Sequence, residues 1–296
     1  MGQETEFKKL SNLAKNMGLI TEREGETLYN LAKNGPGKGA IVEIGSFKGK
    51  STIYLASGSK AAGREKVYAI DTHMAWKEKG KTRAGIYVPK KGAFKFFLSN
   101  LRKARVEDWV VPVKEYSHKA NEKWSKPIRL LFIDGSHKYL HVKLDFLLWE
   151  PFIAKGGIIA LHDSHEIESV KDFGRKCPWI RGPKKVVNER IIKSKRFKNI
   201  RIVDTITIAT KIKKEGAFSR AENSLYAFWL KERLYMQRFR KLLVAVRNLL
   251  IKIKISLIIM YHLTISPNTN VGRLGIIIKK ISPRLYYKLR KIKDEI

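Results

Sequence analysis

The sequence predicts an α/β fold built on a doubly wound, mostly parallel sheet, and three observations support this prediction. Short apolar runs that suit buried strands alternate with helical segments between residues 40 and 165. Several of these runs end in an acidic residue, and one ends in a glycine turn that leads into a helix. The chain has 296 residues, of which 44% are hydrophobic, so it can form one sizeable core.

Two helices are expected before the sheet, within an N-terminal helical segment spanning residues 1–38. Leu10, Leu13 and Met17 recur at helical spacing, and Thr21-Glu-Arg-Glu24 resembles a capping box at the start of the second helix. A glycine- and proline-rich stretch then ends this segment.

Strands and helices are expected to alternate in the next segment, residues 39–215. The expected strands cover residues 40–44, 67–71, 110–114, 128–134, 157–163 and 199–211. The expected helices between them cover residues 51–56, 93–104 and 139–153. Residues 72–93 are polar and basic, and they predict a long loop that is either a substrate lid or a solvated segment.

The last segment, residues 216–296, predicts a basic amphipathic helical extension, with helix from residue 220 to 262. Residues 211–296 contain 20 Lys and Arg against 5 Asp and Glu. The longest apolar run, residues 255–265, is shorter than the ~20 residues that cross a membrane. Two interpretations stay open: the helix lies in an anionic membrane surface, or it packs on its own domain or on a second subunit of a homo-oligomer.

Charge is the unusual feature of the composition. The formal net charge of +34 attracts nucleic acid, anionic lipid surfaces or acidic glycans, although a lysine-rich proteome would give the same value. The N-terminus is polar and lacks the apolar stretch of a signal peptide, so the expected location is cytoplasmic, or peripheral at the inner face of the membrane. Cys177 is the single cysteine, which excludes an intramolecular disulfide.

The glycine turn follows the first expected strand, in Val42-Glu-Ile-Gly-Ser-Phe-Lys-Gly-Lys-Ser-Thr52. Gly45 lets the backbone approach a ligand closely, Gly49 frees the turn into the helix, and the helix start offers N–H groups to an anion. Three residues separate the two glycines, where a phosphate-binding loop has four, and GxGxxG is absent. Asp71, after the second strand, suits the two hydroxyls of a ribose.

Four stretches together resemble a known family. E-I-G-S-F-x-G-x-S-T, Y-A-I-D, F-I-D-G-S-H-x-Y and G-G-x-I-A-x-H-D resemble the motifs of class I S-adenosylmethionine-dependent methyltransferases over roughly residues 38–175. More narrowly, the chain is similar to the class 24 methyltransferase group, which is related to macrolide-sugar O-methyltransferases and cephalosporin hydroxylase-like proteins. The resemblance implies a Rossmann-like fold, S-adenosylmethionine as cofactor, and O-methylation of a hydroxyl on a sugar, glycan or small molecule.

The resemblance also implies a cofactor site. Glu43, Gly45 and Ser46 would line the methionine end of the cofactor, Ser51 would hold its carboxylate, and residues near Ser117 would lie by the adenine. The full set of expected cofactor-binding residues is Glu43, Gly45, Ser46, Gly49, Ser51, Asp71, Thr72, Ser117 and Asp134.

Asp134-Gly-Ser-His137 is the most specific motif, and the resemblance implies that Asp134, His137 and Asp163 are catalytic. Asp134 and Asp163 would bind a divalent cation, and a neutral His137 would take the proton of the acceptor hydroxyl. Oxygen-rich ligands favour Mg²⁺ or Ca²⁺ over softer metals. His162, where the relatives place a carboxylate, would shift the metal site (Asp134, Asp163, His162) toward Mn²⁺ or leave it without metal. The alternative for His137 is a helix cap or an ordinary surface histidine.

Three other functions remain open at this point. The charge suits a nucleic-acid methyltransferase, but no Asn-Pro-Pro-Tyr-like motif follows the fourth strand, which makes nucleic acid a weaker expectation than a small acceptor. A non-catalytic membrane- or polyanion-binding protein with a vestigial Rossmann core is a second alternative. A metal- and oxygen-dependent hydroxylase is the third.

Overall fold

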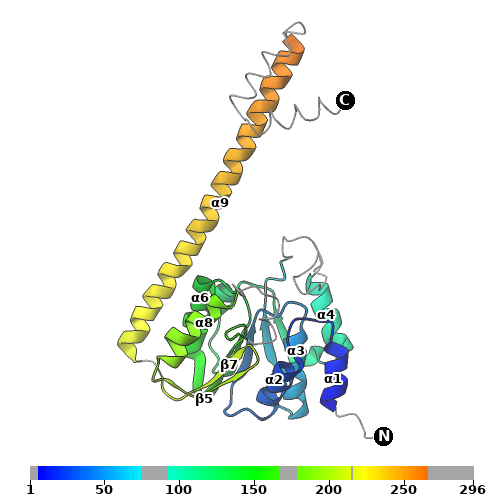
Figure 1. Ribbon diagram of the computed structural model, residues 1–296, viewed down its shortest axis with the longest axis vertical. Coiled ribbons are helices and arrows are strands. Elements are labelled where there is room, and N and C mark those ends of the chain that lie inside the picture. Colours follow the sequence, from blue (N-terminus) through cyan, green and yellow to red (C-terminus); the bar gives the residue numbers. More distant parts are fainter. Residues whose placement is uncertain (1–5, 75–92, 167–178, 215, 266–296) are drawn as a thin grey trace. The chain divides into compact units, whose positions relative to one another are not determined.

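The computed structural model describes residues 6–74, 93–166, 179–214 and 216–265 (Figure 1). A seven-stranded sheet has the order β3-β2-β1-β4-β5-β7-β6. β1 to β5 are parallel, whereas β7 is antiparallel to both β5 and β6, so the predicted Rossmann-like, mostly parallel sheet is confirmed. The strands are β1 (Ala40–Ile44), β2 (Val67–Ile70), β3 (Val110–Val113), β4 (Ile128–Ile133), β5 (Ile153–Leu161), β6 (Phe197–Val203) and β7 (Ile206–Lys211).

Helices cover both faces of this sheet. Figure 1 shows α2 and α3 next to each other, with α6 and α8 on the opposite side of the sheet. The α-helices are α1 (Glu6–Ala14), α2 (Glu22–Asn34), α3 (Lys50–Ala61), α4 (Ala93–Lys103), α5 (Ser117–Glu122), α6 (Tyr139–Trp149), α8 (Arg181–Val187) and α9 (Ala217–Ile265). Shorter helical segments are the 3₁₀ helices η1 (Glu107–Trp109) and η2 (Glu150–Phe152) and the π-helix η3 (Asn188–Ile192).

The register of the parallel strands brings their carboxyl ends to one edge. Ile44 pairs with Ile70 on one side and with Ile133 on the other, and Ile133 pairs with Leu161. The residues that follow these positions therefore lie close together, as expected where ligands bind to doubly wound sheets.

The prediction of one late strand over residues 199–211 is wrong. The stretch forms parts of two antiparallel strands, β6 and β7, joined by a turn at Asp204 and Thr205. Asp204 has a φ of 48°, a left-handed conformation that a short aspartate side chain tolerates. Isoleucines occupy every second position both before and after the turn, so the sequence pattern resembles one continuous strand.

The N-terminal helix α2 packs firmly against the domain. Its capping box is present as predicted, because Thr21 Oγ1 accepts from the Glu24 N–H while Glu24 accepts from the Thr21 N–H. At its other end, buried Arg129 of β4 donates to the carbonyls of Leu31 and Ala32. These bonds fix α2 beside the sheet and bring its first turn to the carboxyl edge.

The chain divides into two compact units, Met1–Lys231 and Glu232–Ile296. The predicted boundaries after residues 38 and 215 stay predictions. The expected loop at residues 72–93 lies mostly outside the described residues, as does Cys177. None of the described helices combines the length and apolar composition needed to cross a membrane.

Candidate active site

Strained backbone gathers at the carboxyl edge of the sheet. Phe47, His73 and Asp163 follow β1, β2 and β5 and have φ values of 46°, 47° and 50°. Such conformations cost energy in residues other than glycine and persist where the surroundings impose them, commonly at functional sites.

Gly45 allows β1 and β4 to meet at this edge. Its φ is 89°, and a Cβ there would lie 2.3 Å from the carbonyl oxygen of Asp134. Any larger residue would displace the backbone that carries Asp134. The close approach that Gly45 permits in the structure is between two strand ends, and its approach to a ligand stays a prediction.

We expect Gly45→Ala to lower the free energy of unfolding by at least about 2 kcal/mol and to weaken ligand binding, because it adds this clash to an unfavourable φ. Gly63→Ala is the matched control, since Gly63 also has a positive φ of 58° but has open space around its would-be Cβ. Urea unfolding of both variants measures the difference. Equal losses would show that backbone conformation alone decides the cost.

Asp71 closes the glycine loop onto β2. Its Oδ2 accepts the N–H groups of Ser46 at 3.0 Å and Phe47 at 2.8 Å, and its Oδ1 accepts the His73 N–H at 2.7 Å. Three of the roughly four acceptor sites of the carboxylate are thus occupied, and Oδ1 keeps one for a ligand hydroxyl. Thr72 lies half-buried beside it, and its Oγ1 accepts from the Met74 N–H at 3.4 Å.

Glu43 is fully buried next to the start of α3. Thr52 Oγ1 donates to its Oε2 at 2.5 Å. Burial raises the pKa of Glu43 to about 8, against the opposing hydrogen bonds of Ser51 and Thr52. Among the described residues, Glu43 Oε1 and Ser46 Oγ are buried without any hydrogen-bond partner. Orphaned buried oxygens of this kind suit a ligand that donates hydrogen bonds, such as an ammonium group.

Ser117 has its hydroxyl engaged within the protein. It donates to Asp145 Oδ1 at 2.6 Å and accepts from Trp149 Nε1 at 2.9 Å, both on α6. Burial raises the pKa of Asp145 to about 7. Ser117 thus orders α5 against α6, and its contact with an adenine stays a prediction.

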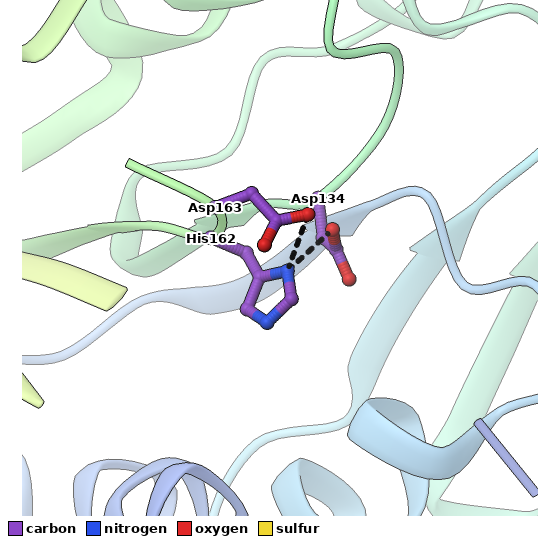
Figure 2. A group of neighbouring side chains, drawn as sticks. All are labelled: Asp134, His162 and Asp163. Atoms are coloured by element: carbon purple, nitrogen blue, oxygen red, sulfur yellow. Dashed lines mark hydrogen bonds and ion pairs between the residues drawn. The ribbon is translucent and has the colours of Figure 1, made fainter. Parts of the chain in front are cut away.

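Asp134, His162 and Asp163 form one cluster after β4 and β5 (Figure 2). Nδ1 of His162 lies 3.0 Å from Asp134 Oδ1 and 3.6 Å from Asp163 Oδ2. Ligand atoms of the three residues all lie within 4.8 Å of one another. Burial raises the pKa of Asp163, helped by the negative charge of Asp134. Two carboxylates and an imidazole nitrogen this close need a proton or a cation between them, so the predicted metal ligands do converge.

Glu24 contacts the cluster from the side of His162 that faces away from the two aspartates, and the sequence did not predict this role. Its Oε2 lies 3.4 Å from His162 Nε2, and its Oε1 accepts from the Thr205 N–H and hydroxyl. Although burial opposes ionisation, bonds from His162 and Thr205 lower the pKa of Glu24 to about 2. Burial likewise disfavours a charged His162, but Asp134 and Glu24 hold its pKa well above the usual value.

His137 faces the same two aspartates from the loop before α6. Its Nε2 lies 3.2 Å from Asp163 Oδ2 and 3.8 Å from Asp134 Oδ1, and it is buried without a well-directed hydrogen bond. Burial works against protonation, but the two carboxylates raise the pKa of His137. The structure thus brings together all three residues predicted to be catalytic.

The missed residues share one property: their partners are distant in sequence. Glu24 accepts a hydrogen bond from Thr205, which lies 181 residues away in the sequence. The capping box accounts for a glutamate at this position, so nothing in the sequence suggested a second role. Asp145 sits inside an apolar helix pattern. Its only sequence signal is an acid on a helix that is otherwise largely buried, which predicts a partner but does not say which.

A family model described as a methyltransferase domain, of class 24, matches residues 42–164, which run from within β1 to just past β5. A solved structure from Corynebacterium glutamicum superposes with a TM-score of 0.51 at 18% identity, covering 71% of this chain and 93% of that chain. An O-methyltransferase from Bacillus cereus in complex with SAH gives 0.48 at 18% identity, with 71% and 93% covered.

The fold and the matched segment agree with each other. The Corynebacterium structure shows the same Rossmann-like arrangement, and the matched residues include Glu43, Asp71, Asp134, His137 and Asp163. Residues 42–164 are therefore similar to a methyltransferase domain of class 24, and the fold around them is the Rossmann-like one.

Proposed function

We propose that this enzyme transfers the methyl group of S-adenosylmethionine to a hydroxyl of a sugar, glycan or small-molecule acceptor. The observation that carries the proposal is His137 Nε2, which faces Asp134 and Asp163 at the carboxyl edge of the sheet. A base beside two carboxylates suits an acceptor that must lose a proton during transfer.

We assign the donor site to the part of the same edge that follows β1 and β2, next to β4. Glu43 Oε1 and Ser46 Oγ, buried without partners, suit the ammonium of the methionine moiety. The start of α3 at Ser51 offers N–H groups to its carboxylate, and Asp71 offers carboxylate oxygens to the ribose hydroxyls. Bound S-adenosylmethionine supplies an electrophilic methyl group on a sulfonium.

The chain's own residues would align the acceptor and remove its proton. The acceptor oxygen forms a bond to the methyl carbon as the carbon–sulfur bond breaks, and the hydroxyl proton passes to His137 Nε2. Alignment lowers the barrier because it removes the entropy cost of bringing the two substrates together. The raised pKa of His137 allows it to keep the proton once it has taken it.

A divalent cation fits the cluster of Asp134, His162 and Asp163. The donor set of two carboxylates and an imidazole suits Mg²⁺ or Mn²⁺, and the crowding of negative charge favours binding of a cation. Such an ion would orient the acceptor hydroxyl and lower its pKa. Because the pKa of His162 is raised, a proton competes with the metal for the imidazole nitrogen. The affinity for the metal should therefore rise with pH.

Calorimetric titration with S-adenosylhomocysteine, with and without magnesium, tests the proposal. We expect Asp71→Ala to weaken binding by more than about tenfold, because charge-assisted bonds to the ribose and the anchor of the glycine loop are both lost. Unchanged affinity would remove Asp71 from the cofactor site. No binding by the native chain would contradict the donor assignment altogether.

Binding of S-adenosylhomocysteine should also release protons from Glu43. With its pKa raised to about 8, this carboxyl is mostly protonated at neutral pH, and an ammonium next to Oε1 would lower that pKa. The apparent binding enthalpy should then vary with the ionisation enthalpy of the buffer, and Glu43→Gln should abolish the dependence. Equal proton release in that variant would assign it to another group.

A further inference from the structure

An apolar face is exposed on the part of α9 that belongs to the second compact unit. Residues three and four apart on a helix share one side of it. Six apolar side chains follow this spacing and are each 43 to 60% exposed: Phe239, Leu242, Leu243, Val246, Leu249 and Leu250. We call these six residues the apolar face of α9.

Positive charge accompanies the apolar face. From Arg233 to Lys293 the sequence has 15 Lys and Arg and no Asp or Glu. Arg240 and Arg247, both exposed, lie seven residues apart and flank the face on one side. The helix therefore combines exposed apolar area with a cationic field that has no local acidic residue to neutralise it.

We propose that the apolar face of α9 docks onto an anionic lipid surface, with the helix lying in the plane of the membrane. Apolar side chains enter the boundary between headgroups and acyl chains, and arginines at their flank meet the lipid phosphates. An anionic lipid surface therefore accounts for both the exposed apolar side chains and the positive charge of the helix. The inference is independent of which acceptor the enzyme methylates.

A second copy of the helix is a poorer occupant. Paired apolar faces are stabilised when acidic and basic residues alternate at their borders. Here no acid is available to pair with Arg240 and Arg247 at the border of the face, because the sequence has no Asp or Glu between Arg233 and Lys293. Nucleic acid would use the charge but would leave the apolar face in water.

Sedimentation of the full-length protein with vesicles tests the proposal. We expect strong binding to vesicles of equal parts phosphatidylcholine and phosphatidylglycerol, and at least about tenfold weaker binding to phosphatidylcholine alone, with the difference shrinking as salt rises. Equal binding to both vesicles would overturn the role of charge. Binding to neither would overturn the proposal.

Two matched double variants separate the apolar face from the rest of the helix. Leu242→Gln with Leu249→Gln removes two residues of the face, seven apart, without a change in charge. Val244→Gln with Ile251→Gln does the same on the opposite side of the helix, where Val244 is 57% and Ile251 is 39% exposed. Only the first pair should lower vesicle binding, by about tenfold or more.

Circular dichroism and binding of S-adenosylhomocysteine show that both variants keep their fold. Equal loss of vesicle binding in the two pairs would contradict the docking of this face. Sedimentation equilibrium without lipid tests whether the apolar face mediates self-association instead. A dimer that the Leu242 and Leu249 changes dissociate, with no vesicle binding by the native chain, would assign the face to self-association and overturn the lipid proposal.

Discussion

Replacing His137 by alanine should lower the rate of methyl transfer by about 10²- to 10⁴-fold, the usual contribution of a general base. Binding of S-adenosylhomocysteine should be unchanged, because His137 Nε2 faces Asp134 and Asp163 rather than the glycine loop. Single-turnover assays on an acceptor found by screening measure the rate, and calorimetry measures the binding.

His165→Ala provides the control, since His165 lies two residues beyond Asp163 and has no assigned role. The pH profile gives an independent readout. The carboxylates raise the pKa of His137, and the base must be neutral, so kcat should fall as pH drops through a value above 6.5. Full activity of the alanine variant, or a rate that increases toward low pH, would remove His137 as the base.

Local patterns in the sequence predicted the frame of this site well. Parallel strands in alternation with helices must bring residues 45, 71, 134 and 162 to one edge, and the register confirms that they meet there. The turn at Asp204 was missed because apolar residues alternate before and after it. The alternation of apolar residues indicates which face of a strand is buried. A tight turn between two strands can leave this alternation unbroken in the sequence, so the pattern does not reveal the turn.

The charge balance of the site was not predictable, because it depends on contacts between distant elements. The resemblance flagged His162 as a departure at a metal position. Only the folded chain shows Glu24 of α2 opposite its Nε2 and Asp134 opposite its Nδ1. The N-terminal helices, which lie outside the motifs of the resemblance, thereby supply a residue to the cluster.

Glu24→Gln should lower the free energy of unfolding by about 3 kcal/mol, because it breaks a buried ion pair while leaving His162 buried. The side chains of Glu24 and His162 are only 1% and 6% exposed, so water screens the pair little. Since Gln keeps an oxygen for Thr205, the loss reflects mainly the missing charge. Urea unfolding of both proteins measures it.

The sign of the pH dependence follows from the pKa of Glu24, which folding lowers from 4.5 to about 2. Its contribution is complete above 4.5 and is lost as pH falls from there toward 2, so the gap between native protein and variant should close over that interval. His162 acts at the other end, because its raised pKa stabilises the fold below its usual 6.5 and that contribution fades at higher pH.

Glu26→Gln is the matched control for this experiment. Glu26 lies two residues further along α2 and is exposed, so its loss should change stability by less than about 0.5 kcal/mol at any pH. A stability gap for Glu24→Gln that stays constant below pH 4.5 would show that shape, not charge, sets the cost. A gap that closes would establish that an ionised carboxylate on α2 holds the histidine of the Asp134 cluster in place.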